Sequence, residues 1–218
     1  MTRTLSDLTA ALLDAATRAG ADAADALAVD GTALSIDIRA GKLEQAERAE
    51  GVELGLRVLI GRRQACVSVS DISDATIRAV AERAVAMACE APEDPYAGLA
   101  DPDQLARGWD VAALDLSDES NPPSAAALEE DARRAEAAAL DGGDITQVEA
   151  SAGHSRRAMH IAATNGFSGG YGRTARSCSA VAFTGTGTGM ERDWSAESRI
   201  FSADLPSPEV IEIGRAHV

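Results

Sequence analysis

Apolar residues at every second position predict a β-hairpin between residues 52 and 69. Polar Glu53 and Arg57 lie between the apolar residues, and residues 61–63 supply a turn. The alternating apolar positions are Val52, Leu54, Leu56, Val58, Ile60, Ala65, Val67 and Val69. Because successive side chains of a strand point to opposite faces, one face of this hairpin is buried and the other meets water. We expect the hairpin to be central in the fold.

Three stretches carry the three-four apolar spacing of a helix that buries one face. The first runs from Leu5 to about Ala19, begins with a Thr4/Asp7 capping box and stops at Gly20. The other two are framed by their own start and stop signals. Asp71 or Ser73 can cap a helix that ends before Pro92 and packs across the hairpin's sheet, and Ser124 can cap a helix that ends at Gly142-Gly143.

The remaining segments indicate further strands. Residues 23–29 predict a strand and Asp30-Gly31 a tight turn, after which Leu34, Ile36 and Ile38 mark the inward face of the next strand. A meander of strands is predicted beyond the third helix, separated by glycine-rich turns, at 145–151, 157–164, 171–184 and 190–202. The predicted class is α+β, with mixed, largely antiparallel β-sheet and three to four helices packed on it.

The domain organisation follows from length and from one irregular stretch. A chain of 218 residues that is 45% hydrophobic can bury a real core. Residues 90–123 are rich in Pro, Asp and Gly and show no sustained period, which is typical of a long loop. We expect one domain over 1–211, with two lobes at about 1–92 and 123–211 joined by this loop.

Charge and cysteine usage restrict the expected partners and the expected cellular compartment. Thirty-five acids against 20 bases give a formal net charge of -15, which repels phosphate backbones and anionic membrane surfaces, so neither nucleic acid nor membrane is an expected partner. No segment is apolar for long enough to span a bilayer or to serve as a signal peptide. Cys66, Cys89 and Cys178 are odd in number and far apart, which favours a reducing, cytoplasmic compartment.

The histidines do not predict a metal site. They are His154, His160 and His217, and the first two are six residues apart in strand or turn context, so they share no helical face. A catalytic zinc takes about three protein ligands and one open position. We therefore assign no metal ligand in this chain.

Ser168 lies in Gly166-Phe167-Ser168-Gly169-Gly170, which matches the GxSxG nucleophile elbow. An elbow is followed by a helix, whereas the residues from Tyr171 onward alternate as a strand, and no histidine follows until His217. The favoured interpretation is a turn that joins two strands, its glycines allowing positive φ. A serine hydrolase centred on Ser168 stays open as an alternative.

A second glycine-rich stretch, 185–189, resembles a phosphate loop only in composition. Position 190 is methionine, and no Lys-Ser/Thr pair or helix follows. It predicts a hairpin tip, beside which Glu191, Arg192 and Asp193 form an exposed charged strand. We assign no catalytic or cofactor-binding residue.

Four separated stretches resemble the TldD/PmbA family, and its PmbA (TldE) branch most. They read GLRVLIGRRQACVSVSDIS from Gly55, APEDPYAGLADP from Ala91, TNGFSGGYGRTARSCSAVA from Thr164 and GMERDW from Gly189. Trp194 stands where the family pattern leads us to expect tyrosine. The resemblance runs to about Ile211, favours a strand over 42–50, and implies the N-terminal part of a longer protein whose C-terminal domain is absent here.

The resemblance implies a role in proteolysis. TldD-like subunits are expected to hold zinc on an HExxxH helix, a motif that this chain lacks. The implied function is a non-catalytic, substrate-handling part of a cytoplasmic metalloprotease heterodimer that processes peptides and unfolded proteins, with zinc in the TldD-like partner. The family is thus a hydrolase family, while this chain's own enzymatic status is left open. The alternative is a protein-binding regulator of the DNA gyrase modulator type.

The last seven residues, EIGRAHV from Glu212, equal what one reading frame of a common sequencing adapter encodes. We expect 212–218 to be a non-native tail. The competing interpretation is that they begin a helix of the family.

Overall fold

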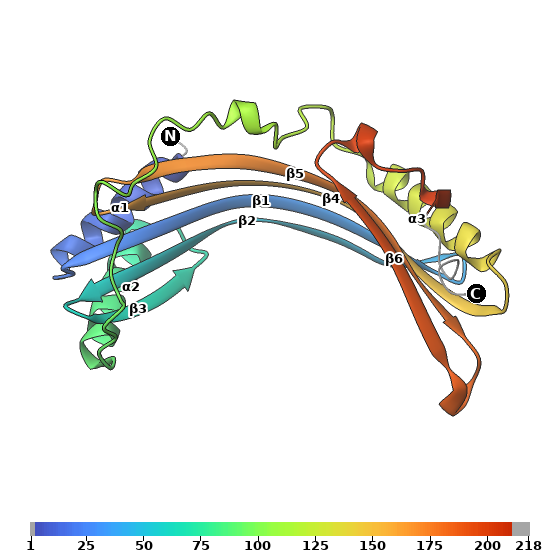
Figure 1. The fold of residues 1–218 in the computed structure, drawn as a ribbon, viewed down its shortest axis with the longest axis horizontal. Helices are drawn as coiled ribbons and strands as arrows, with labels where there is room; N and C mark the ends of the chain where they lie inside the picture. Colours follow the sequence, from blue (N-terminus) through green and yellow to red (C-terminus); the bar gives the residue numbers. More distant parts are fainter. Residues whose placement is uncertain (1–2, 211–218) are drawn as a thin grey trace. The chain divides into compact units, whose positions relative to one another are not determined.

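A computed structural model describes residues 3–210 and gives an α+β fold, as predicted (Figure 1). Within that range six strands form one antiparallel sheet in the order β3-β2-β1-β4-β5-β6. The strands are β1 (Ala23–Arg39), β2 (Lys42–Ile60), β3 (Arg63–Val69), β4 (Ile145–Ala163), β5 (Ser168–Thr184) and β6 (Glu191–Arg199). The helices are α1 (Leu5–Arg18), α2 (Asp74–Glu90) and α3 (Ala125–Leu140), and short 3-10 turns lie at Ala112–Leu114, Gly187–Gly189, Ser202–Asp204 and Pro208–Val210.

The helix boundaries lie where the sequence places them, because each start has a side-chain cap. The Thr4 hydroxyl accepts the Asp7 N–H while the Asp7 carboxylate accepts the Thr4 N–H, which completes the capping box of α1. Ser73 caps α2 and Ser124 caps α3. In each case the serine hydroxyl accepts the backbone N–H of the residue three positions later. The three predicted helices are confirmed.

The strands are longer than predicted, and two predicted breaks are wrong. β1 continues through Asp30-Gly31, where the backbone stays extended, and turns only at Ala40-Gly41, whose φ angles are 52° and 68°. β4 likewise continues through residues 152–156, where we expected a turn. Alternation keeps its phase across both points, so the polar residues there remain on regular strand positions. The strand over 42–50 is confirmed as part of β2.

The hairpin of residues 52–69 is present, but its central position was wrong. Leu54 pairs with Val69 and Ile60 with Arg63, and Gly61 turns the chain with φ 57°. However, β3 is the edge strand of the sheet. α2 packs on β3, as expected from their matched apolar faces.

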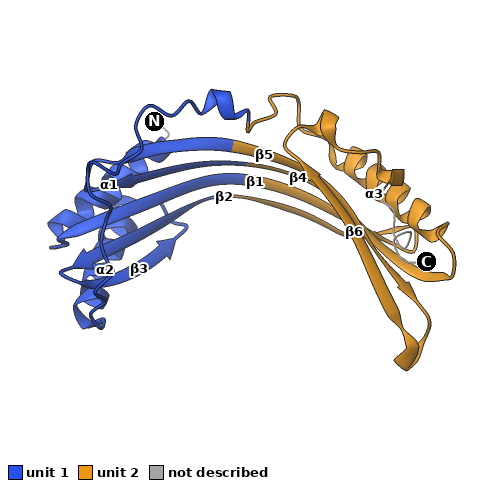
Figure 2. Ribbon diagram, in the orientation of Figure 1, with its two compact units in different colours: residues 1–31, 51–115, 157–172 blue, residues 32–50, 116–156, 173–218 orange. Residues whose placement is uncertain are grey.

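The chain divides into two compact units (Figure 2). Unit 1 comprises residues 1–31, 51–115 and 157–172, and unit 2 comprises 32–50, 116–156 and 173–218. Each unit takes three separate segments because β1, β2, β4 and β5 each contribute residues to both. This division by compactness differs from the contiguous lobes 1–92 and 123–211 that the sequence suggests. The predicted tail, 212–218, lies outside the described residues.

Each unit has its own apolar core. In unit 1, α1 and α2 pack on the strands around a core of alanines and larger aliphatic residues, the latter including Leu8 and Leu12 of α1, Ile77 of α2, and Leu54 and Leu56 of β2. In unit 2, α3 covers a core that is mostly alanine, with Ile36, Ile38, Leu128, Val148 and Cys178 as its larger members. The low aromatic content of the sequence is consistent with these closely packed aliphatic cores.

Candidate functional site

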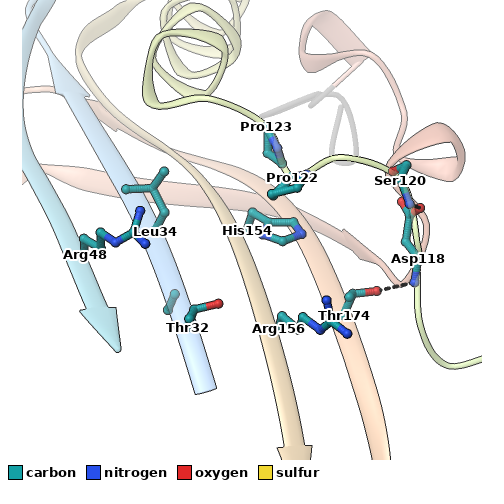
Figure 3. Close-up of a pocket in the computed structure, with 11 residues that line it drawn as sticks. Thr32, Leu34, Arg48, Asp118, Ser120, Pro122, Pro123, His154, Arg156 and Thr174 are labelled. Carbon is teal, nitrogen blue, oxygen red and sulfur yellow. Dashed lines mark hydrogen bonds between the residues drawn. The ribbon is translucent and has the colours of Figure 1, made fainter. Parts of the chain in front are cut away.

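A small hollow lined by polar and apolar residues lies in unit 2 and is named the His154 pocket (Figure 3). Its volume is about 160 Å³. Four strands contribute to it: Thr32 and Leu34 from β1, Arg48 from β2, His154 and Arg156 from β4, and Thr174 from β5. The loop before α3 closes another side with Asp118, Ser120, Pro122 and Pro123.

Strand alternation positions these side chains. On β4, Val148, Ala150 and Ala152 are buried in the unit 2 core, and His154 and Arg156 continue the same every-second-residue series. On β1, Thr32 and Leu34 likewise precede the buried Ile36 and Ile38. The pocket therefore forms on the core-facing series of the strands, at positions where polar residues replace the apolar ones.

Asp118 fixes the loop against the sheet. Its carboxylate accepts the Ser120 N–H at 2.9 Å and the Ser202 N–H at 2.8 Å, and its own N–H donates to the Thr174 hydroxyl at 2.8 Å. The hydrogen bonds from Ser120 and Ser202 lower the pKa of Asp118 to about 2. The carboxylate is therefore ionised and already satisfied at neutral pH.

His154 is uncharged at neutral pH. Partial burial lowers the pKa of its imidazole, the nearby Arg176 lowers it further, and Asp118 opposes them. The ring can thus donate one hydrogen bond and accept another. It can also gain a proton if an anion arrives beside it.

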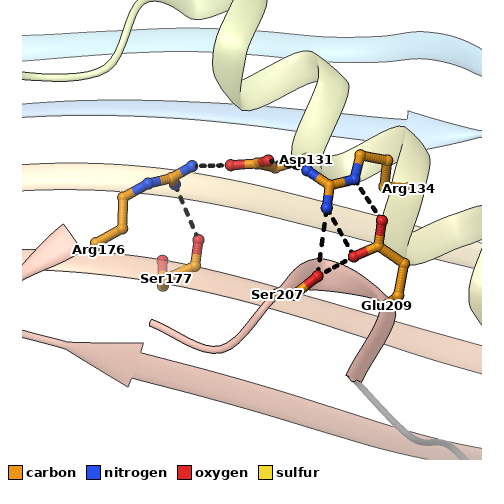
Figure 4. Close-up of polar contacts among 6 residues, drawn as sticks. All are labelled: Asp131, Arg134, Arg176, Ser177, Ser207 and Glu209. Atoms are coloured by element: carbon orange, nitrogen blue, oxygen red, sulfur yellow. Dashed lines mark hydrogen bonds and ion pairs between the residues drawn. The ribbon is translucent and has the colours of Figure 1, made fainter. Parts of the chain in front are cut away.

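A polar network next to the pocket holds α3 on the sheet (Figure 4). Arg176 of β5 is 4% exposed and donates to the Asp131 carboxylate at 2.5 Å and to the Gly153 carbonyl at 2.8 Å. Arg134, also on α3, binds Glu209 through two hydrogen bonds of 2.5 and 2.7 Å. The hydrogen bonds from Arg134 and Ser207 lower the pKa of Glu209 to about 2.

Ser168 lies at the turn between β4 and β5 and contacts a histidine that sequence order did not suggest. Its hydroxyl is 3.3 Å from His160 Nε2, and His160 Nδ1 is 2.8 Å from the hydroxyl of buried Thr9. Thr9 donates its own proton to the Ser6 carbonyl at 3.0 Å, so it accepts from Nδ1–H. This assignment leaves Nε2 free to accept the Ser168 proton.

The glycines around Ser168 are explained by packing. The predicted turn is confirmed: β4 ends at Ala163, β5 begins at Ser168, and Gly166 has φ 94°. A Cβ on Gly170 would lie 2.3 Å from the Met159 carbonyl oxygen, and one on Gly169 would lie 2.2 Å from the Trp109 ring, which stacks on Phe167. Strand β5 begins at the serine, where a nucleophile elbow leads into a helix.

The second glycine-rich stretch and the charged strand beside it lie as expected. Residues 185–189 form the tip between β5 and β6, and Glu191, Arg192 and Asp193 are exposed. Among residues 3–210, no three His, Cys, Asp or Glu side chains are gathered closely enough to hold a metal ion, so the residues described do not fit a zinc site. His217 lies outside them. None of the helices there is both long and apolar enough to cross a membrane.

The sheet has two edges, β3 and β6. Alternate residues of an antiparallel strand turn their N–H and C=O groups to the same side. On β6 the Trp194 N–H donates to the Asp193 side chain at 2.8 Å, so it does not serve β5, and Arg192, Ala196 and Ser198 share its orientation. Trp194 is 68% exposed and neighbouring Met190 is 58% exposed.

Sequence reasoning missed the His154 pocket. The lost signal was a run of polar residues at inward positions of β4, which the predicted turn at 152–156 concealed. It also missed the contact of His160 with Ser168, because only histidines after the serine were considered.

Comparison with known families identifies two successive domains. Residues 24–88 match PmbA/TldA metallopeptidase domain 1, and residues 118–216 match the PmbA/TldA metallopeptidase central domain. The metalloprotease PmbA of Escherichia coli O157:H7 is 31% identical over 192 residues, which cover 86% of this chain and 42% of that protein. The metalloprotease PmbA homolog of Haemophilus influenzae is 35% identical over 105 residues, covering 48% of this chain and 22% of that protein.

Solved structures agree on the fold. TldE from Thermococcus kodakarensis superposes with a TM-score of 0.72 at 14% identity, covering 94% of this chain and 45% of that one. A candidate modulator of DNA gyrase from Bacteroides thetaiotaomicron gives 0.80 at 23% identity, covering 92% and 46%. The chain spans less than half of the length of each of these relatives. It belongs to the PmbA/TldD metallopeptidase family.

Proposed function

We propose that this chain is the non-catalytic, substrate-handling part of a PmbA (TldE)-like subunit in a cytoplasmic metalloprotease that processes peptides and unfolded proteins. The observation that carries the proposal is the match to the first and central family domains along the chain. In this proposal the zinc belongs to a TldD-like partner, which forms a heterodimer with the PmbA-like subunit. The three cysteines, all free, suit a reducing compartment.

We place peptide handling at the β6 edge. An extended peptide can add a strand to a sheet through main-chain hydrogen bonds, which are indifferent to side-chain identity. The outward N–H groups of Arg192, Ala196 and Ser198 provide such a ladder, while the Trp194 N–H already donates to Asp193 and the exposed Trp194 side chain provides an apolar contact. The β3 edge is shorter, and Arg63 at its start is tied to the Cys89 carbonyl at 2.7 Å.

The test uses the intact protein that contains this chain, purified with its TldD-like partner. Ala196→Pro removes an outward N–H, whereas the control Ala196→Thr keeps it at the same exposed position. We expect the proline variant to bind an unfolded test protein about three- to tenfold more weakly, the equivalent of about one hydrogen bond. Equal affinities of two folded variants would remove the β6 edge from the proposal.

Co-purification tests the function itself. Cleavage of the unfolded protein should need both subunits together. Capture of DNA gyrase without any TldD-like subunit would favour the regulator alternative instead.

A serine hydrolase at Ser168 is the second candidate, favoured by the His160 contact. In that scheme the Ser168 oxygen adds to an acyl carbonyl, whose π electrons move onto its oxygen, while the serine proton passes to His160 Nε2. The carbonyl re-forms as the bond to the leaving amine or alcohol breaks, and that group takes the proton from His160, whose tautomer is held by buried Thr9. A fluorophosphonate probe tests it. Labelling that is lost in Ser168→Ala and His160→Gln but kept in the exposed control Ser70→Ala would support this function, and absence of labelling would exclude it.

A further inference from the structure

We propose that the His154 pocket binds the carboxylate at the C-terminus of a peptide, an inference that rests on the proposed role in peptide handling. The pocket combines cationic groups, neutral donors and an apolar wall in a small volume. Each of these features restricts the ligand.

The positive charge comes from two guanidinium groups on different strands. Arg156 of β4 has no ion-pair partner among residues 3–210 (Figure 3). Arg48 of β2 pairs with Glu50 at 3.1 Å, but both side chains are about two-thirds exposed, so this surface pair is weak and exchangeable. Planar guanidinium groups match the two oxygens of a carboxylate.

Neutral donors complete the polar side. The Thr32 hydroxyl has no hydrogen-bond partner in the described part of the chain, and the His154 imidazole faces the same hollow. The Asp118 carboxylate is held by two backbone N–H groups and stays ionised. Its charge, together with the formal net charge of -15, disfavours a multiply charged anion and favours one with a single charge.

Size and the apolar wall select what carries the carboxylate. Leu34, Pro122 and Pro123 supply the apolar part of the pocket lining. A volume of about 160 Å³ is below the range of about 300 Å³ or more that drug-sized ligands occupy. It suits the last residue of a peptide, with its side chain on the prolines and its carboxylate toward Arg156.

His154 makes the affinity depend on pH. The charged groups around its ring are Arg156 on β4, Arg48 on β2, Arg176 on β5 and Asp118 in the loop. A bound carboxylate stabilises the protonated imidazole and so raises the pKa of His154. Affinity should therefore rise as the pH falls from 8 to 6, while the peptide carboxylate stays ionised.

The experiment titrates the intact protein with three versions of one labelled hexapeptide. The first ends in leucine with a free carboxylate, the second is its amide, and the third is an amide with an internal glutamate. We expect the free-carboxylate peptide to bind about tenfold or more tightly than both amides. Equal binding of all three would overturn the proposal, and tight binding of the glutamate peptide would overturn the assignment to a chain terminus.

Two variants that remove the same charge distinguish binding in the pocket from attraction by the general electrostatic field of the protein. Arg156→Gln should lose most of the preference for the free carboxylate, and Arg156→Lys should retain part of it. Arg173→Gln removes the same charge from an exposed residue that precedes Thr174 and so faces the other side of β5. Equal losses in the Arg156 and Arg173 glutamine variants would contradict the pocket. If the unaltered protein shows no preference for the free carboxylate but still cleaves unfolded protein with its partner, the pocket alone is overturned and the proposed function stands.

Discussion

In both units the helices pack on the apolar face of the strands, but different contacts hold them there. The two helices of unit 1 bury four large aliphatic residues, Leu8, Leu12, Ile77 and Val80, besides five alanines, and Thr9 is the buried polar side chain among the described residues of that unit. The one helix of unit 2 buries Leu128 and three alanines as its apolar residues, and the unit also buries Glu136, Thr174 and Arg176. Because alanine contributes little apolar area, charged hydrogen bonds take a larger share in positioning α3. The unit with the polar interior is also the one with the His154 pocket.

The turn between β1 and β2 shows the same contrast. The buried Glu136 carboxylate of α3 accepts the Gly41 N–H at 2.9 and 3.1 Å, and Arg133 donates to the Gly41 carbonyl. One helix thus holds a turn far from it in sequence through polar contacts. In unit 1, α1 and α2 contact the strands through apolar residues, and the Gly61 N–H of the turn between β2 and β3 donates to the carboxylate of Asp22, which lies outside the helices, at 2.7 Å.

The largest expected effect is loss of aliphatic volume in unit 1. Leu12 is fully buried between α1 and the sheet, so Leu12→Ala should lower the free energy of unfolding by about 3 to 4 kcal/mol. Urea denaturation of the intact protein measures this. A loss below about 1 kcal/mol would show that unit 1 does not depend on its aliphatic core.

In unit 2, the free energy of unfolding should be sensitive to removal of a charged side chain from the polar network. Asp131→Ala leaves Arg176 buried without its carboxylate, and because Asp131 is itself 25% exposed the cost should be about 2 to 3 kcal/mol. Glu130→Ala is the matched control, an exposed acid on the same helix, expected to change stability by less than about 0.5 kcal/mol. Similar unfolding curves for both variants would contradict the role given to the network.

A tight backbone approach in unit 1 should cost somewhat less. Gly170→Ala brings a Cβ within 2.3 Å of the Met159 carbonyl oxygen, whereas in Gly172→Ala the nearest atom is 3.9 Å away. We expect a loss of about 1 to 3 kcal/mol for the first and little change for the second. Thermal unfolding of the two variants measures this difference. Equal melting temperatures would refute the close approach of Gly170 to the Met159 carbonyl.

Thiol reactivity should distinguish the buried cysteine of the unit 2 core from the two exposed cysteines, without a change of sequence. Burial raises the pKa of Cys178, in the unit 2 core, to about 11, whereas Cys66 and Cys89 are exposed. A raised pKa means less thiolate at pH 8, and the thiolate is the reactive form. A thiol reagent should therefore modify Cys66 and Cys89 in the native protein and Cys178 only after unfolding. Rapid native labelling of Cys178 would mean that this core opens readily.

Local signals were enough to predict the helices, but not the length of the strands. Thr4, Ser73 and Ser124 each mark a helix start through contacts within one turn. Asp30-Gly31 carries an equally strong turn signal, yet the chain stays extended there because pairing with neighbouring strands outweighs local preference. The candidate sites depend on such pairing. Arg48 and His154 are brought to one pocket by the sheet, and no spacing within a single segment could have indicated it.

The central claim is that this chain handles substrate while a TldD-like partner supplies the zinc. The direct measurement is the zinc content of each separately purified intact subunit, followed by cleavage of an unfolded protein when the two are mixed. The account predicts about one zinc in the TldD-like subunit, none in the subunit containing this chain, and chelator-sensitive cleavage only by the mixture. Stoichiometric zinc and cleavage in the subunit containing this chain alone would contradict it.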